Sequence, residues 1–170
     1  MGNCGAFADA YEAGAKEGGH EVRRLNIGEL QFDPILHKGY RAIQQLEPDL
    51  IKVQEHFKWA DHVVIIYPNW WASMPAILKG MFDRMYLPGF AFKFSDHAYS
   101  WKRLLKGRSA RVIIALNANP WLEWLMIGDY SNEIRRGILW FAGISPVRGT
   151  YIGPIEHMSP MKLSHWKEKI

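Results

Sequence analysis

The chain has 170 residues, of which 48% are hydrophobic, 22% charged and 14% aromatic. This length suits one domain that buries most of its apolar surface, so we predict a single domain over residues 1–170. The formal net charge of +4 comes from Lys and Arg scattered along the chain rather than gathered in a stripe, which argues against nucleic-acid binding.

The sequence also argues against several other classes of protein. A single Cys excludes an internal disulfide and a zinc site built from cysteines, and the seven His lack metal-binding spacing, so no metal site is expected. We recognise no signal peptide and no apolar run long enough to span a bilayer. A cytoplasmic protein without an integral membrane segment is therefore expected.

The first part of the chain predicts a helix followed by an extended segment. Gly5 to Lys16 places apolar side chains on one helical stripe, and Gly18 and Gly19 end the helix. Glu21 to Ile27 is predicted to be a short strand at the edge of a sheet. A turn-rich connection then leads to a helix from Pro48 to Trp59.

The centre of the chain predicts a strand and a helix joined by a short loop. Val63 to Tyr67 is β-branched and apolar, which indicates a strand buried on both faces in the middle of a sheet. Ala76 to Tyr86 repeats apolar residues at helical spacing, with Ser73 as the N-cap and Pro75 near the first helical position.

The loop from Pro68 to Met74 is a candidate ligand site. It follows the carboxyl end of a predicted parallel strand, where open α/β sheets bind their ligands. Trp70 and Trp71 offer two flat indoles beside backbone N–H groups, which suits a planar aromatic ligand. Packing in a core or an interface is the alternative role for such a pair.

A second loop is predicted to lie beside the first. Arg111 to Leu116 is another buried strand, and Asn117 to Trp121 follows at its carboxyl end. Loops at the ends of neighbouring parallel strands can contact one ligand. The asparagine amides can donate hydrogen bonds to it, although Asn and Pro serve a simple turn equally well.

The remaining segments continue an alternation of strands and helices. We predict a helix from Asn132 to Phe141, a strand from Pro146 to Ile152 and a closing amphipathic helix from Pro160 to Lys169. Phe90 to Phe94 is an extended segment with alternating phenylalanines, and Ser95 to Lys106 has no clear pattern before Trp101. The alternation predicts an α/β fold with a parallel sheet.

The run YPNWWASMPAILKGMFDRMYLPGFAFKF resembles the signature of the flavodoxin-like NAD(P)H:quinone oxidoreductases. LQFDPIL and GILWFAGI resemble two further segments of that family. The resemblance implies a flavodoxin-like, doubly wound parallel sheet of strand order 2-1-3-4-5 with helices on both faces. The family's central first strand is not recognisable here, and either a truncated start or a true variant with a gapped sheet would explain this.

The resemblance further implies a flavin, FMN or FAD, with NAD(P)H as co-substrate. The family holds the flavin ring with both loops and cradles the flavin phosphate before the first helix, while two aromatic residues line the substrate pocket. No catalytic acid or base is assigned. The cofactor-binding residues so implied are Asn3, Cys4, Pro68, Asn69, Trp70, Trp71, Ala72, Asn117, Ala118, Asn119, Pro120 and Trp121, and the substrate-pocket residues are Phe92 and Phe94.

The function so implied is hydride transfer from NAD(P)H to a quinone or similar acceptor by a ping-pong mechanism. Two alternatives stay open: a regulatory subunit like the ancillary subunits of potassium-efflux systems, and a truncated member that binds no flavin. Because members of the family are commonly dimers, a homodimer is expected.

Overall fold

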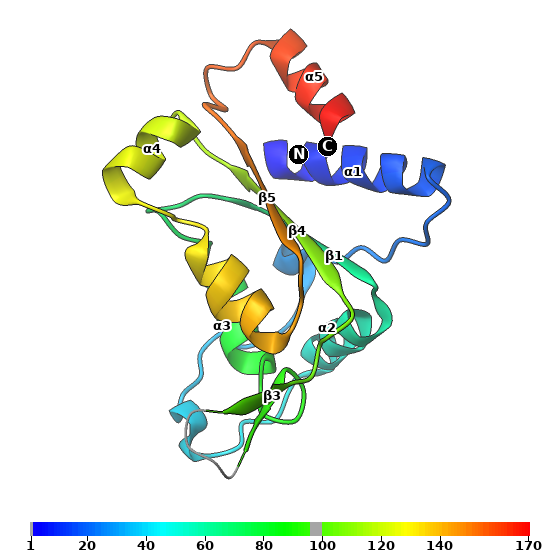
Figure 1. The fold of residues 1–170 in the computed structure, drawn as a ribbon, viewed down its shortest axis with the longest axis vertical. Coiled ribbons are helices and arrows are strands. Elements are labelled where there is room, and N and C mark those ends of the chain that lie inside the picture. The colour runs from blue at the N-terminus through cyan, green and yellow to red at the C-terminus, as the bar shows by residue number, and fades with distance from the viewer. Residues whose placement is uncertain (1, 96–99) are drawn as a thin grey trace.

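The computed structural model describes residues 2–95 and 100–170 (Figure 1). The elements in chain order are α1 (Asn3–Glu17), η1 (Ile27–Glu29), η2 (Gly39–Arg41), α2 (Pro48–Trp59), β1 (His62–Pro68), α3 (Ala76–Met85), β2 (Phe92–Phe94), β3 (Trp101–Arg103), β4 (Ser109–Ala115), α4 (Pro120–Ile127), η3 (Glu133–Trp140), β5 (Val147–Ile152) and α5 (Pro160–Lys169).

The main sheet of the described residues is parallel, with strand order β1-β4-β5. Its register pairs Val64 with Arg111 and Arg111 with Arg148, so β4 is bonded on both edges. Parallel strands need crossover connections, and helices provide them here: α3 lies between β1 and β4 in the chain, and η3 between β4 and β5. The predicted α/β class is confirmed.

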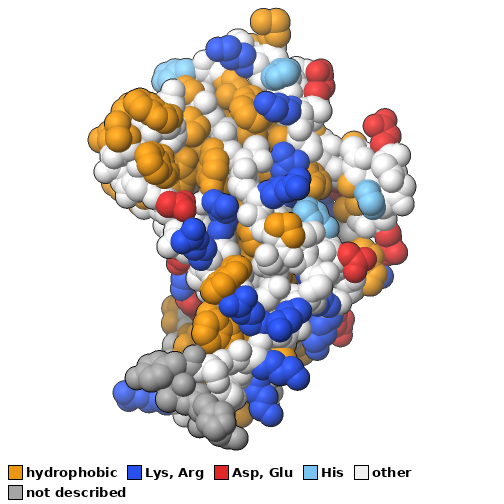
Figure 2. Space-filling view, viewed as in Figure 1, with side chains coloured by type: hydrophobic (Ala, Val, Ile, Leu, Met, Phe, Trp, Pro, Cys, Tyr) orange, Lys and Arg blue, Asp and Glu red, His pale blue; other side chains and the backbone are white. Residues whose placement is uncertain are grey.

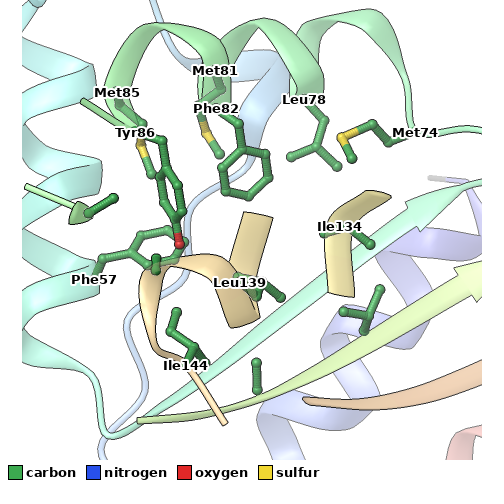
Figure 3. Close-up of a cluster of buried hydrophobic side chains, with 14 of the residues drawn as sticks. Phe57, Met74, Leu78, Met81, Phe82, Met85, Tyr86, Ile134, Leu139 and Ile144 are labelled. Carbon is green, nitrogen blue, oxygen red and sulfur yellow. The ribbon is translucent and has the colours of Figure 1, made fainter. Parts of the chain in front are cut away.

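Helices cover both faces of the sheet, as in a doubly wound fold (Figure 1). One face packs against α2, α3 and η3, and Figure 3 shows Phe82 and Leu78 of α3 pointing toward Leu139 and Ile134 of η3. The other face packs against α1 and α5, around the fully buried Phe7. The amphipathic stripes of these helices therefore supply two hydrophobic cores with the sheet between them.

The first strand of this sheet differs from expectation. We predicted a central strand buried on both faces, but β1 lies at the edge of the described sheet and Val63 to Ile66 are only half-buried. Among the described residues, only β4 pairs with β1. Because β4 is bonded on both edges, it is the strand that is fully buried, from Val112 to Ala115.

The predicted edge strand from Glu21 to Ile27 is wrong. The backbone there is extended but unpaired, because no segment in residues 2–95 and 100–170 exchanges ladder hydrogen bonds with it. Side chains hold the segment in place instead: Leu25 packs against the core, and Arg24 pairs with Asp9 at 2.5 Å.

Three further local features differ in detail from the sequence analysis. Ser73 is not the N-cap of α3, since Pro75 holds that position and the Ser73 hydroxyl donates to Glu133 at 2.9 Å. The patternless segment before Gly107 contains β3, which pairs with β2 as a small antiparallel hairpin. Most of the predicted helix after Asn132 is a π-helix, η3.

A buried arginine fastens the connection before α2 onto α3. Arg84 has a fully buried side chain that pairs with Glu47 at 2.9 Å and donates to the carbonyl oxygens of Gln45 and Asp33. Four residues earlier on α3, a Cβ added to Gly80 would lie 2.5 Å from the Cβ of Pro34. The PAILKG and DR segments of the signature therefore form a docking surface for the FDP segment.

Candidate functional site

The two loops predicted to share a ligand lie side by side at the carboxyl end of the sheet. Pro68 is in register with Ala115, and the Asn69 N–H donates to the Ala115 carbonyl at 2.8 Å. Between the loops and α4 lies a pocket of about 650 Å³. Its lining residues are Asn69, Trp71, Ala72, Asn117, Ala118, Leu122, Glu123, Met126 and Ile127.

The tryptophan loop turns through a strained hairpin. Trp70 and Ser73 exchange backbone hydrogen bonds of 2.9 and 3.1 Å, and the two residues between them, Trp71 and Ala72, have φ of 54° and 59°. Two successive positive φ values are typical of a type I′ turn, which favours Gly and Asn. In the described part of the chain, the N–H groups of Trp71 and Ala72 have no backbone acceptor.

The Trp71 indole does not belong to a core, because its side chain is 101% exposed. A large aromatic side chain gains most when it is covered, and here it borders a pocket. The turn therefore combines an uncovered indole at the pocket with two N–H groups that have no backbone acceptor in the described residues.

The asparagine loop is held by its own hydrogen bonds. The Asn119 side chain accepts from the Trp121 N–H at 3.0 Å and so caps α4, and the Asn117 amide donates to Glu156 at 2.8 Å. A Cβ added to Gly153 would lie 2.5 Å from the Ala118 carbonyl oxygen, so the chain after β5 supports this loop closely. These bonds use the side-chain oxygen of Asn119 and one N–H of Asn117, so the bonds themselves leave further amide N–H groups for the predicted donation to a ligand.

Helix α4 was missed by the sequence analysis and forms one wall of the pocket. Asn119 followed by Pro120 is a recognisable helix start, and this signal could have revealed it. Leu122 and Met126 face the pocket, whereas Trp121 and Trp124 lie on the outer side of the helix. Pro120 and Trp121, predicted to bind the cofactor, are therefore not among the pocket-lining residues.

The outer side of α4 is an exposed apolar face. Trp121, Trp124 and Leu125 are 68%, 55% and 61% exposed, and Figure 2 shows hydrophobic side chains gathered over α4 at the upper left. In the described residues α4 buries no side chain fully, because the residues not in contact with the pocket have nothing to pack against. We refer to these three residues as the α4 outer face.

Glu123 lies on this missed helix, and the sequence analysis did not predict it as a site residue. It lies on the pocket side of α4, and the Asn69 amide donates a short hydrogen bond to its carboxylate. Burial raises the pKa of Glu123, and the bond from Asn69 acts in the opposite direction by stabilising the charged form. Among the described residues lining the pocket, Glu123 is the only titratable one.

Asn3 and Cys4, which were predicted to hold the flavin phosphate, are not among the residues that line this pocket. Both residues lie at the start of α1. Cys4 packs against the core between α1 and the sheet, and burial raises the pKa of its thiol to about 11. That pKa describes a protonated, unreactive thiol at neutral pH.

Phe92 and Phe94, which were predicted to line the substrate pocket, are not among the residues that line the pocket beside α4. Both lie in the β2–β3 hairpin, which precedes β4 and sits at the amino end of the sheet, far from α4 in Figure 1. Phe92 packs edge-on against Phe141 with ring centroids 5.3 Å apart. The hairpin precedes the amino end of β4, whereas the pocket lies at the carboxyl end, and the substrate-pocket role of the two side chains stays a prediction.

Within residues 2–95 and 100–170, no three His, Cys, Asp or Glu side chains lie close enough together to hold a metal ion. His97 lies outside the described residues. In the same residues, no helix combines the length and the apolar composition needed to cross a bilayer.

A doubly wound parallel sheet with a pocket where two neighbouring strands end defines a flavodoxin-like α/β protein. Comparison with known families agrees: the flavodoxin-like fold family matches residues 1–170, and the chain belongs to this family.

Individual relatives carry names that bear on activity. An uncharacterised NAD(P)H oxidoreductase of Haemophilus influenzae is 30% identical over 88% of this chain and 76% of its own length. An FMN-dependent NADH:quinone oxidoreductase of Listeria innocua is 28% identical over 69% of this chain and 58% of its own length. A solved structure from Streptococcus mutans superimposes with a TM-score of 0.79 at 26% identity, covering 100% of this chain and 94% of that one. The chain spans about half the length of other curated relatives that it matches, 42% and 48% in two cases.

Proposed function

We propose that the protein is a flavin-dependent oxidoreductase that transfers a hydride from NAD(P)H to a quinone or a similar acceptor. The observation that carries this proposal is the convergence of the tryptophan turn and the asparagine loop on one pocket at the carboxyl end of the sheet. The names of the Haemophilus and Listeria relatives, which mention NAD(P)H, FMN and quinone, support the same reading.

The residues of the pocket fit a flavin ring. A flavin ring is planar and largely apolar, and it has polar edges. The side chains of Trp71, Leu122 and Met126 suit its apolar faces, and the backbone N–H groups of the turn suit its polar edges. The pocket volume of about 650 Å³ lies within the range of small-molecule sites. FMN and FAD share this ring, and the proposal covers both.

The chain contributes orientation and electrostatics. The N–H groups of Trp71 and Ala72, fixed by the strained turn, would donate to the ring edge, and fixed dipoles of this kind stabilise developing negative charge. The Trp71 indole and the apolar wall of α4 exclude water from the same space. When bound, the flavin supplies the carrier that accepts the hydride from NAD(P)H and passes it on.

A ping-pong order is proposed because the co-substrate and the acceptor would use one pocket in turn. Since NAD(P)H is a reductant of the cytoplasm, the proposal also places the protein there. The physiological acceptor is proposed at the level of a quinone class, since the apolar walls select flat, weakly polar molecules.

We also propose a homodimer in which the α4 outer face lies at the subunit interface. Three large apolar side chains exposed together are typical of an interface. Phe94 is 64% exposed at the opposite end of the sheet, so the predicted substrate-pocket role would require Phe94 of the partner subunit.

The experiment is a titration of the purified chain with FMN and with FAD, followed by flavin fluorescence. We expect a yellow complex that NAD(P)H bleaches under anaerobic conditions and that a quinone restores to yellow. Trp71→Ala should weaken flavin binding about tenfold, because it removes one wall of the pocket. Trp59→Ala, a change on α2 outside the pocket, serves as the control. A folded chain that binds neither flavin would overturn the proposal.

A further inference from the structure

We propose that Glu123 is the proton donor for reduction of the acceptor in this pocket. The inference rests on the proposed function and adds a residue with a chemical role. It starts from the chemistry of the acceptor: a quinone becomes a hydroquinone by taking up one hydride and one proton. The hydride derives from NAD(P)H, and the proton must come from a separate acid.

The geometry points to one side chain for this proton. Glu123 is the only titratable residue among the described residues that line the pocket, and it lies on α4 beside Asn69, at the start of the tryptophan loop. The Asn69 amide donates to one of its carboxylate oxygens, which holds the group in place. The other oxygen is free to carry a proton. A general acid must lie within the space that the reacting molecule occupies, and Glu123 meets this condition.

The surroundings of Glu123 favour an acid that holds its proton. Burial raises the pKa of Glu123 above that of an ordinary glutamate, and a bound flat ligand would remove more water from the carboxyl group. The other titratable group near it is Tyr130, whose pKa is raised to about 12 by burial and by the charge of Glu123. Tyr130 is therefore neutral at physiological pH and adds no charge beside Glu123.

The step balances without another reactant. The O–H bond of the Glu123 carboxyl breaks, a new O–H bond forms on the acceptor oxygen, and the electron pair of the broken bond stays on the carboxylate. The hydride supplies both electrons that reduce the acceptor. Water reprotonates Glu123 when the product leaves, because the pocket is open to solvent on one side.

The test compares two acceptors of the reduced, flavin-loaded protein. Ferricyanide takes electrons without protons, whereas a quinone requires both. Glu123→Gln keeps a partner for Asn69 but cannot donate a carboxyl proton. We expect Glu123→Gln to slow the reaction with a quinone about a hundredfold more, relative to wild type, than the reaction with ferricyanide. Glu168→Gln on α5 is the matched control and should equal wild type with both acceptors.

Two further measurements separate a chemical role from a structural one. In wild type the rate with quinone should fall as the pH rises through the pKa of Glu123, and this decline should be absent in Glu123→Gln. Carboxyl-carbon NMR of the flavin-free chain should give Glu123 a pKa above the ordinary glutamate value. Asn69→Ala should raise it further, because the bond that stabilises the carboxylate is lost.

The outcomes distinguish the two proposals. Failure to bind a flavin would end the proposed function. A flavin-loaded Glu123→Gln variant that reduces quinone as fast as wild type would end the inference about Glu123 and leave the proposed function intact. An equal slowing with both acceptors would also contradict proton donation, since ferricyanide needs no proton.

Discussion

At the scale of single residues, the signature segment has two roles, one at the pocket and one in the packing of the fold. Trp71 and Ala72 form the strained turn beside the pocket, whereas Gly80 and Arg84 hold the polypeptide before α2 against α3. Trp71 and Ala72 line the pocket, whereas Gly80 and Arg84 are buried. Mutations of the first pair should therefore affect ligand binding, and mutations of the second pair should affect stability.

Gly80→Ala is expected to destabilise the protein by roughly 2 kcal/mol, because overpacking a tight contact costs about that much. The added methyl group would meet the Pro34 Cβ at 2.5 Å and the Pro34 carbonyl oxygen at 2.6 Å. Denaturant unfolding measures the effect. Gly14→Ala is the matched control, since a methyl group there meets nothing within 4 Å, and it should stabilise α1 by about 0.5–1 kcal/mol. Equal effects of the two changes would contradict the packing argument.

Ala72→Gly is expected to increase the free energy of unfolding by about 1 kcal/mol, because glycine adopts positive φ without the steric cost that alanine bears. The backbone N–H of residue 72 is retained, so flavin affinity should change little. Thermal unfolding with and without FMN would measure both quantities. Ala8→Gly in α1 is the opposite control and should lose about 1 kcal/mol. A destabilised Ala72→Gly variant would show that the turn is not strained.

At the scale of elements, the helices were predicted closely and the strands less so. Helical periodicity is local, so α2 and α5 have the predicted bounds and α1 differs from its prediction by two residues at its start and one at its end. A strand exists only when another segment pairs with it. Two errors follow from this. A strand was predicted from Glu21 to Ile27 but is not formed, and β3 is formed but was not predicted.

The ion pair that joins α3 to the start of α2 should make stability depend on pH. Burial acts to raise the pKa of Glu47, but the ion pair with Arg84 and hydrogen bonds from backbone N–H groups together hold the pKa below the ordinary glutamate value. A lowered pKa in the folded state means that the contribution is complete above the unfolded-state pKa and is lost as the pH falls through the folded-state pKa. Glu47→Gln should therefore cost roughly 2 kcal/mol at pH 7 and much less below the pKa of Glu47 in the folded state.

Urea unfolding of wild type and Glu47→Gln between pH 2 and pH 7 measures this difference. Glu55→Gln on the same helix provides the control, since Glu55 has no ion pair among those found in the described residues. A difference between wild type and Glu47→Gln that stays constant over the whole pH range would exclude the ion pair as its source.

At the scale of the whole molecule, the α4 outer face and the pocket are two sides of one short helix. The pocket side is explained by the proposed flavin site, and the outer side needs a different occupant. A second subunit would cover it, and this would place α4 between a ligand and an interface. Assembly and ligand binding would then be coupled through a single helix.

Trp124→Arg is expected to convert the proposed dimer into a monomer, because it puts a charge into the centre of an apolar interface. Light scattering during gel filtration measures the mass, and the monomer mass is 19.7 kDa. Met161→Arg, at an exposed apolar position on α5, should leave the mass of the assembly unchanged. A wild-type protein that is monomeric at micromolar concentration would contradict the homodimer.

The sequence by itself determined the α/β class, the helices other than α4 and the position of both loops in the chain, because periodicity and the order of strand, loop and helix are local properties. It also placed Trp71 and Asn117 at neighbouring strand ends, and β1 and β4 are adjacent. Only the tertiary structure decided which side chains face the pocket. In the structure, α4 places Glu123 at the pocket, and the β2–β3 hairpin places Phe92 and Phe94 at the opposite end of the sheet. The physical reason is that a side chain's direction depends on the packing of its element against others, which no local pattern records.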